Sequence, residues 1–142
     1  MTLKQNGLSR RLAIEARRIS SQHRQLDELY GLLLGALEHE PLAAVRRGFE
    51  RFRDALEAHF AMEDDVHFPA FHGLRPELES RLSALIEEHK VMRKALDDVW
   101  TCLKSGDLET GAKFLDALVV RLARHEEIEE QLIGGLGKLP QD

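Results

Sequence analysis

The sequence contains a single cysteine, Cys102, among its 142 residues. One thiol excludes an intrachain disulfide and a metal site built from cysteines alone. It also fits a reducing compartment, and we therefore expect a cytoplasmic protein. Aromatic residues make up only 6% of the chain and there are four prolines, a composition that favours helices over a β-sandwich.

Long apolar runs are also missing. No run of about 18 apolar residues occurs, so we predict no membrane-spanning segment, and the N-terminus lacks the apolar stretch of a signal peptide. The formal net charge of −5 argues against nucleic acid as a partner. The length suits one domain with one hydrophobic core, and we predict a single domain over residues 1–142.

Three breaks divide the chain, marked by Pro41, by Gly73 with Pro76, and by Gly106. Proline suits the first turn of a helix, whereas glycine commonly ends one. After the third break, Ser105 or Asp107 is a candidate N-cap. The breaks predict four helices and a C-terminal tail that should fray, at about residues 8–39, 42–72, 76–105 and 107–133, with the tail at 134–142.

Within each segment, mostly apolar residues recur at alternating steps of three and four, the spacing of one helix face. The four series are Leu12, Ala16, Ile19, His23, Leu26, Tyr30, Leu33, Leu37; Phe49, Phe52, Leu56, His59, Glu63, Val66, Ala70; Leu82, Leu85, His89, Met92, Leu96, Val99, Leu103; and Leu115, Leu118, Leu122, His125, Glu129, Leu132. With connections this short, the chain should fold as an all-α, up-down-up-down antiparallel four-helix bundle.

Each series is interrupted by one histidine, and two series also contain a glutamate. The six residues are His23, His59, Glu63, His89, His125 and Glu129. Each glutamate follows a histidine by four residues and therefore shares its helix face. Counting from the breaks at about 1.5 Å per residue places the four histidines in one layer of the bundle.

Two carboxylates buried beside four imidazoles require compensating positive charge. A protonated histidine–glutamate network provides it only if every member is satisfied. Two divalent metal ions also provide this positive charge, and they would be bound by four nitrogen ligands and two bridging carboxylates. Such ligands suit iron or manganese, and zinc is a possible substitute. A lone histidine of this kind is usually structural, but the whole set predicts a dinuclear metal site.

The other polar residues are expected to be structural. His67 fits an ordinary helix-end residue better than a gate or a neighbour of the ligands, and His39 and His72 lie near helix C-termini, where imidazolium is favoured. We expect a solvated basic face at Arg10, Arg11, Arg17 and Arg18, partly balanced by Glu15. We also expect five solvated acidic residues, namely Asp64, Asp65, Glu126, Glu127 and Glu130. Of these, Asp64 and Glu130 lie beside the presumed ligands and can contact them.

In this order the motifs resemble those of hemerythrin-like proteins of the HHE cation-binding type, over nearly the full length. The family pattern is a histidine, then H-x-x-x-E followed by an acidic residue, then a histidine, then H-x-x-x-E. Here it corresponds to His23, "HFAMED" at 59–64, His89 and "HEEIEE" at 125–130, and "HFP" at 67–69 resembles the family's Leu-Phe-Pro. The resemblance implies two iron ions with an oxo or hydroxo bridge, terminal histidines, and Glu63 and Glu129 as bridges.

Oxygen-carrying hemerythrins have a further histidine four residues after the one on the third helix, where this chain has Arg93. The ligand set is closer to that of di-iron proteins implicated in iron–sulfur repair and nitric-oxide stress, although the cysteine-containing domain of those proteins is not expected here. The Glu-x-x-His motif of ferritin-like proteins is absent.

We therefore expect a di-iron protein that binds or reacts with O₂, NO or peroxide. The alternatives are an iron- or oxygen-sensing module that acts through a partner protein, and a structural bundle with vestigial motifs.

Overall fold

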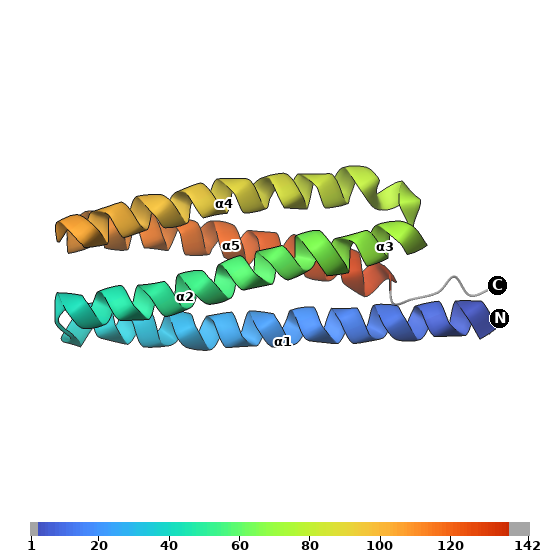
Figure 1. Ribbon diagram of the computed structural model, residues 1–142, viewed down its shortest axis with the longest axis horizontal. Helices are drawn as coiled ribbons and strands as arrows, with labels where there is room; N and C mark the ends of the chain where they lie inside the picture. Colours follow the sequence, from blue (N-terminus) through green and yellow to red (C-terminus); the bar gives the residue numbers. More distant parts are fainter. Residues whose placement is uncertain (1–2, 137–142) are drawn as a thin grey trace.

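The computed structural model describes residues 3–136, and within them the side chains of residues 10–134 other than Leu12. Four long helices run alternately up and down the bundle (Figure 1). They are α1 (Leu3–His39), α2 (Leu42–Met62), α4 (Glu79–Ser105) and α5 (Leu108–Leu136). Helix α1 packs against α2 and α5, and α4 packs against the same two helices. The predicted all-α, up-down-up-down bundle is confirmed.

The connection between α2 and α4 is more irregular than predicted. A π-helical turn, Glu63–His67, continues α2 and leads into α3 (Phe68–Leu74), and a 3₁₀ turn, Pro76–Leu78, leads into α4. At the chain ends, α1 begins at Leu3 rather than at residue 8, and α5 passes the predicted end at 133. Helices propagate more easily than they nucleate, so weak helix formers at an end are tolerated. The predicted inward position of Leu12 and most of the predicted frayed tail lie outside the described residues.

Helices α4 and α5 are joined by a tight turn that depends on one glycine. Gly106 has φ +83°, and the amide of the following residue, Asp107, donates to the carbonyl of Cys102 at 2.9 Å, as at a glycine-terminated helix C-terminus. The carboxylate of Asp107 then accepts from the amide of Thr110 at 3.1 Å. Of the two candidate N-caps, Asp107 is therefore the one that forms the cap.

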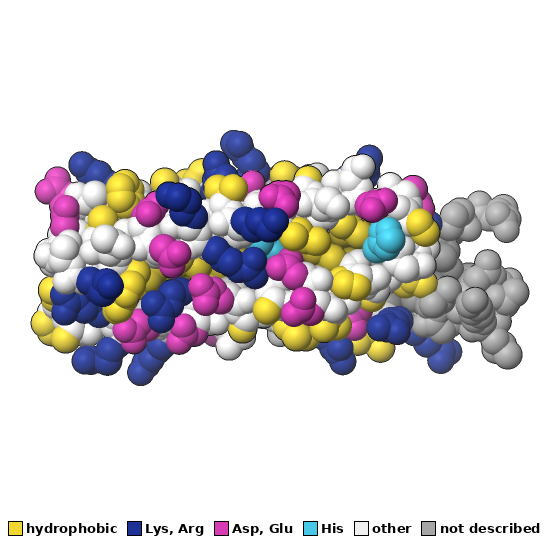
Figure 2. All heavy atoms as spheres, turned by 45° about the horizontal axis from the view of Figure 1, so that its top comes forward, with side chains coloured by type: hydrophobic (Ala, Val, Ile, Leu, Met, Phe, Trp, Pro, Cys, Tyr) yellow, Lys and Arg dark blue, Asp and Glu magenta, His cyan; other side chains and the backbone are white. Residues whose placement is uncertain are grey.

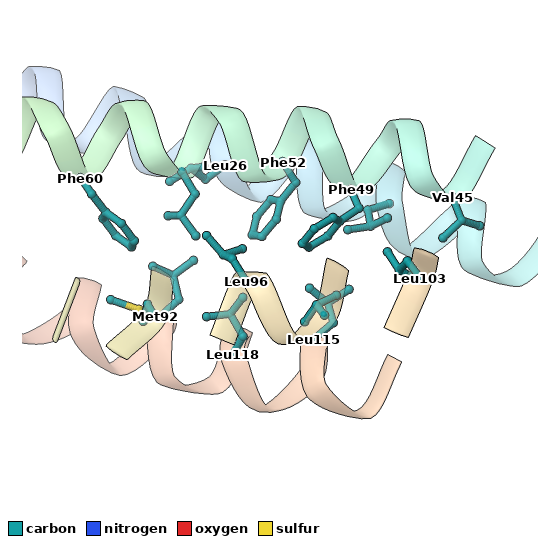
Figure 3. Packing of buried hydrophobic residues seen from close by; sticks show 14 residues of the cluster. Leu26, Val45, Phe49, Phe52, Phe60, Met92, Leu96, Leu103, Leu115 and Leu118 are labelled. Carbon is teal, nitrogen blue, oxygen red and sulfur yellow. The ribbon is translucent and has the colours of Figure 1, made fainter. Parts of the chain in front are cut away.

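Two apolar clusters fill the bundle on either side of the histidine layer. The larger extends from Val45 and Leu103, near the α1–α2 connection, to Phe60 and Met92 (Figure 3). The smaller lies toward the other end of the bundle and contains Ile19, Phe68, Phe71, Leu78, Leu82, Leu85 and Ile133. Along α1, α4 and α5 the buried histidine lies between members of the two clusters, and beyond His59 of α2 the smaller cluster begins in α3. The polar layer is therefore separated from water on both sides.

The π-turn changes the helix face that points inward. Val66 and Ala70 were predicted to face the core, but Val66 is 36% exposed and Ala70 is half-buried. The π-turn holds one residue more than an α-helical turn, which rotates the following residues and buries His67 and Phe71 instead. Pro69 has no amide hydrogen to donate in a regular α-helical hydrogen-bond pattern. This proline was the feature of the sequence from which the irregular turn could have been predicted.

His67 and Glu15 form a buried pair that was not predicted. His67 Nδ1 is hydrogen-bonded to the Glu15 carboxylate across the α1 interface, and both residues are buried. The interpretation of His67 as an ordinary helix-end residue, and of Glu15 as part of a solvated face, was wrong. Glu15 also contacts Arg18 at 3.3 Å, and the four arginines of that face are exposed as expected.

The surface is mixed in charge. On the face shown in Figure 2, basic and acidic side chains are interspersed among the residues drawn in colour, with hydrophobic side chains gathered between them in the half that is nearer to the termini. Within the described residues, no helix combines the length and the hydropathy that crossing a membrane requires.

Candidate metal centre

The structure brings all six predicted site residues together in one layer of the bundle. His23 comes from α1, His59 from α2, Glu63 from the start of the π-turn, His89 from α4, and His125 with Glu129 from α5. Each is at most 4% exposed. Their heights match because each lies a similar number of residues from its nearest helix connection.

These residues form two groups that could each hold one ion. One group is His23, His59, Glu63 and Glu129, and the other is His89, His125, Glu63 and Glu129; within each group the candidate ligand atoms lie within 4.8 Å of one another. The two glutamates belong to both groups. The arrangement therefore has two histidines at each end and two carboxylates that both groups share.

The individual contacts show how the glutamates are shared. Glu63 Oε1 lies 3.2 Å from His59 Nε2 and 3.1 Å from His89 Nε2. Glu129 Oε1 lies 3.1 Å from His23 Nε2, and its Oε2 lies 3.3 Å from His125 Nε2. Each carboxylate thus contacts one histidine of each group, which is the placement that a bridging ligand requires.

The hydrogen bonding in this layer is incomplete, as expected for groups that bind a metal. Both carboxylate oxygens of Glu63 and of Glu129, and Nε2 of His23 and of His59, are buried. None of them forms a hydrogen bond of acceptable geometry, although these nitrogens and oxygens lie 3.1–3.3 Å apart. Leaving such a group unpaired costs about 1–3 kcal/mol. Nε2 of His89 and Nε2 of His125 face each other at 3.0 Å. Nitrogen and carboxylate ligands of this kind fit divalent iron, manganese or zinc.

The protonation states of the metal-free layer offset some of the buried charge. Burial, with the neighbouring Glu129, raises the pKa of Glu63 well above its usual range. Burial would also raise the pKa of Glu129, but contacts with Glu63, His125 and His23 outweigh it and lower that pKa. The protonated form is therefore favoured at Glu63 and the ionised form at Glu129, as in other close carboxyl pairs.

The histidines divide in the same way. Burial lowers the pKa of His59 to about 3 and that of His89 to about 4. Burial acts in the same direction on His23, but Glu129, Glu126 and Glu130 together raise its pKa to about 9. Two imidazoles are thus neutral, the form that binds a metal, whereas His23 must release a proton before it can do so.

Three of the four histidines are oriented by a hydrogen bond at Nδ1. His59 Nδ1 contacts Gln22 Oε1 at 2.5 Å, His23 Nδ1 contacts Glu130 Oε1 at 3.0 Å, and His89 Nδ1 contacts Asp64 Oδ1 at 2.7 Å. Such partners fix the ring and its tautomer in metal sites. His125 differs, because its buried Nδ1 has no partner among the described residues.

Sequence reasoning identified some of these outer contacts. Asp64 and Glu130 do contact the presumed ligands, and Asp65 and Glu127 are exposed as expected. Glu126 was expected to be solvated, but its side chain is only 15% exposed and lies 3.5 Å from His23 Nδ1. Gln22 was missed because no spacing rule singles out a glutamine that reaches across to another helix.

Arg93 stands at the position of the additional histidine of oxygen carriers. Its side chain contacts two residues that pack against His89. Its Nη2 donates to Asp64 Oδ2 at 3.2 Å, and its guanidinium carbon lies 5.5 Å from the ring centroid of Phe60. Phe60 in turn stacks on His89, with the ring centroids 4.2 Å apart. Arg93 therefore fixes the carboxylate that orients His89.

Loss of this support should weaken metal binding. We expect Asp64→Asn to lower zinc affinity by up to about 100-fold and Arg93→Ala by about tenfold, measured by competition with a chromophoric chelator. Lys94→Ala, at the neighbouring exposed position, is the control and should leave the affinity unchanged. Equal affinities of Arg93→Ala and the parent protein would show that the contact does not support the site.

Comparison with known proteins agrees with the geometry. No curated protein sequence and no solved structure shows a significant match to the chain. Residues 16–136, in contrast, match the family model described as the hemerythrin HHE cation binding domain. This match covers most of the chain and includes all six residues of the candidate centre. The chain therefore belongs to the hemerythrin HHE cation-binding domain family.

Proposed function

We propose that this protein is a non-haem di-iron protein that binds or reacts with O₂, NO or peroxide. The observation that carries the proposal is the pair of four-residue groups that share Glu63 and Glu129. His23 and His59 would hold one ion, and His89 and His125 the other. When bound, two ferrous ions would supply the electrons for reducing a small oxidant.

The surrounding side chains favour a small uncharged ligand. Five apolar residues border the layer along the helices and are all buried, namely Leu26, Leu56, Leu85, Met92 and Leu122. Phe60 and Phe68 both stack on His89, at centroid distances of 4.2 and 5.8 Å. An apolar wall of this kind limits entry of water and ions, whereas a diatomic gas dissolves in it readily.

The first test is the number of ions. Because two groups share two carboxylates, the protein should bind two iron ions per chain after anaerobic reconstitution with Fe²⁺, by elemental analysis of desalted protein. Reconstitution with Mn²⁺ or Zn²⁺ should give the same ratio, since the ligands suit all three metals. A ratio of one ion or none would exclude the dinuclear centre.

The second test is the reaction with O₂. Each group contains two histidines, so neither ion would be shielded by a third imidazole. We therefore expect the ferrous protein to oxidise on mixing with O₂ and to remain oxidised after a vacuum cycle, followed by stopped-flow absorbance. Return of the ferrous spectrum under vacuum would instead identify an oxygen carrier. Addition of NO or peroxide in separate anaerobic runs would then distinguish the three candidate ligands.

A further inference from the structure

A groove of about 570 Å³ lies on the outer side of the bundle between α4 and α5. Six apolar residues form most of its lining, namely Ala84, Leu85, Ala117, Val120, Ile128 and Leu132. Val120 is 66% exposed and Ile128 is 50% exposed. The volume lies within the range of small-molecule sites, and mainly apolar walls with a few polar groups are typical of such sites.

The polar part of the groove is predominantly basic. Arg81, Arg121, Arg124 and Glu88 line it together with the apolar residues. Arg121 contacts Glu88 at 3.2 Å, so these two charges offset each other. Among the described residues, no acidic partner lies within ion-pair distance of Arg81 or Arg124. The groove therefore has two uncompensated positive charges in a protein whose net charge is −5.

The groove also reaches the wall of the metal centre. His125 is one of its lining residues, and only 2% of this residue is exposed. Its Nε2 lies 3.3 Å from Glu129 Oε2, on the side of the other site residues, and its second ring nitrogen is Nδ1. This Nδ1 is buried and without a partner, unlike Nδ1 of His23, His59 and His89.

We propose that the groove binds an amphipathic carboxylate, with its apolar chain along Leu85, Val120 and Ile128. Arg81 or Arg124 binds the carboxylate through charge-assisted hydrogen bonds. The bound molecule lies against His125, which lines the groove at the edge of the candidate metal centre.

Other ligand classes fit less well. A free inorganic anion would leave the apolar lining unused, and an uncharged lipid would leave the two arginines unused. A protein partner would require a contact surface far larger than one groove of this size. An apolar carboxylate is the ligand class that satisfies both parts of the groove.

The test measures decanoate binding to the full metal-free chain by isothermal titration calorimetry, below the concentration at which decanoate forms micelles. We expect binding that is at least tenfold weaker for decanol and for the double variant Arg81→Gln/Arg124→Gln. Arg11→Gln, on the opposite pair of helices, should bind like the parent. Absence of binding, equal binding of decanol, or equal binding by the double variant would overturn the proposal.

A second readout examines His125 directly. In the ¹⁵N-labelled, zinc-loaded protein, decanoate should shift the ring signals of His125, which lines the groove, and leave those of His59 in place. Decanoate binding without this shift would overturn the contact with His125. Calorimetry on the metal-free protein does not depend on the proposed reaction, so failure of the di-iron function and failure of this inference can be distinguished.

Discussion

Removal of the metal should lower the melting temperature of this protein by more than about 10 °C. The layer that would hold the ions contains four buried carboxylate oxygens that form no hydrogen bond of acceptable geometry. Metal ligands that are not preformed in the unfolded chain convert binding free energy into folding stability. Ions in thousandfold excess over their dissociation constant contribute about 4 kcal/mol per site. Proton sharing between Glu63 and Glu129 should still allow the metal-free chain to fold.

The comparison requires metal-free and zinc-loaded protein at equal concentration and pH, melted in a calorimeter. His39→Ala is a suitable control, because His39 is exposed at the end of α1 and should not change the difference. Acidification should release the metal by protonating the histidines, and the two melting curves should then converge. Identical melting temperatures at neutral pH would contradict a metal centre in this layer.

Substitution of a shared carboxylate should reduce the amount of bound metal more than substitution of a histidine. Glu63 contacts His59 and His89, one from each group, so in the proposed centre Glu63→Gln would remove a bridging charge from both ions. We expect this variant to lose both ions on desalting, and His59→Ala to retain the ion held by His89 and His125. Elemental analysis with circular dichroism, to confirm the helical content, gives the ratio.

Glu127→Gln provides the matched control, because Glu127 lies on α5 beside the site residues but is exposed. It should bind both ions. If Glu63→Gln and His59→Ala lost the same amount of metal, the glutamate would act as a terminal ligand of one ion and the shared arrangement would be wrong.

The helix period predicted most of the fold because burial on a bundle helix follows the period closely. The apolar members of the α4 series, from Leu82 to Leu103, are all buried. The prediction failed first at Val66, where the backbone makes a π-turn in place of an α-turn. The choice between these two hydrogen-bond patterns depends on contacts with the neighbouring helices. The spacing of apolar residues within one helix contains no information about those contacts. The Glu15–His67 pair was missed for the same reason.

The sequence predicted which residues belong to the candidate site, but not which of them contact one another. Spacing alone places His59 with Glu63 and His125 with Glu129. That Glu63 also contacts His89, and that Glu129 also contacts His23, depends on the rotation and tilt of separate helices. The cap on α4 is similar, since Arg46 of α2 donates to the carbonyls of Leu103 and Lys104 at 2.9 and 2.8 Å. No pattern within one helix predicts such contacts.

The π-turn allows the α2–α3 segment to contain one residue more than a regular α-helix of the same length. One residue added to a regular α-helix would rotate everything after it by about 100°, and the wider π-turn accommodates that residue instead. Deletion of Val66 from Glu63–His67 should therefore restore an α-helical turn and leave α2, Phe68 and Phe71 in place. The same deletion should keep His67 beside Glu15, with His59 and Glu63 at the candidate metal layer. In an alignment of related chains, a one-residue gap at this point would therefore mark a regular α-helical turn, with the core packing on both sides of the site unchanged.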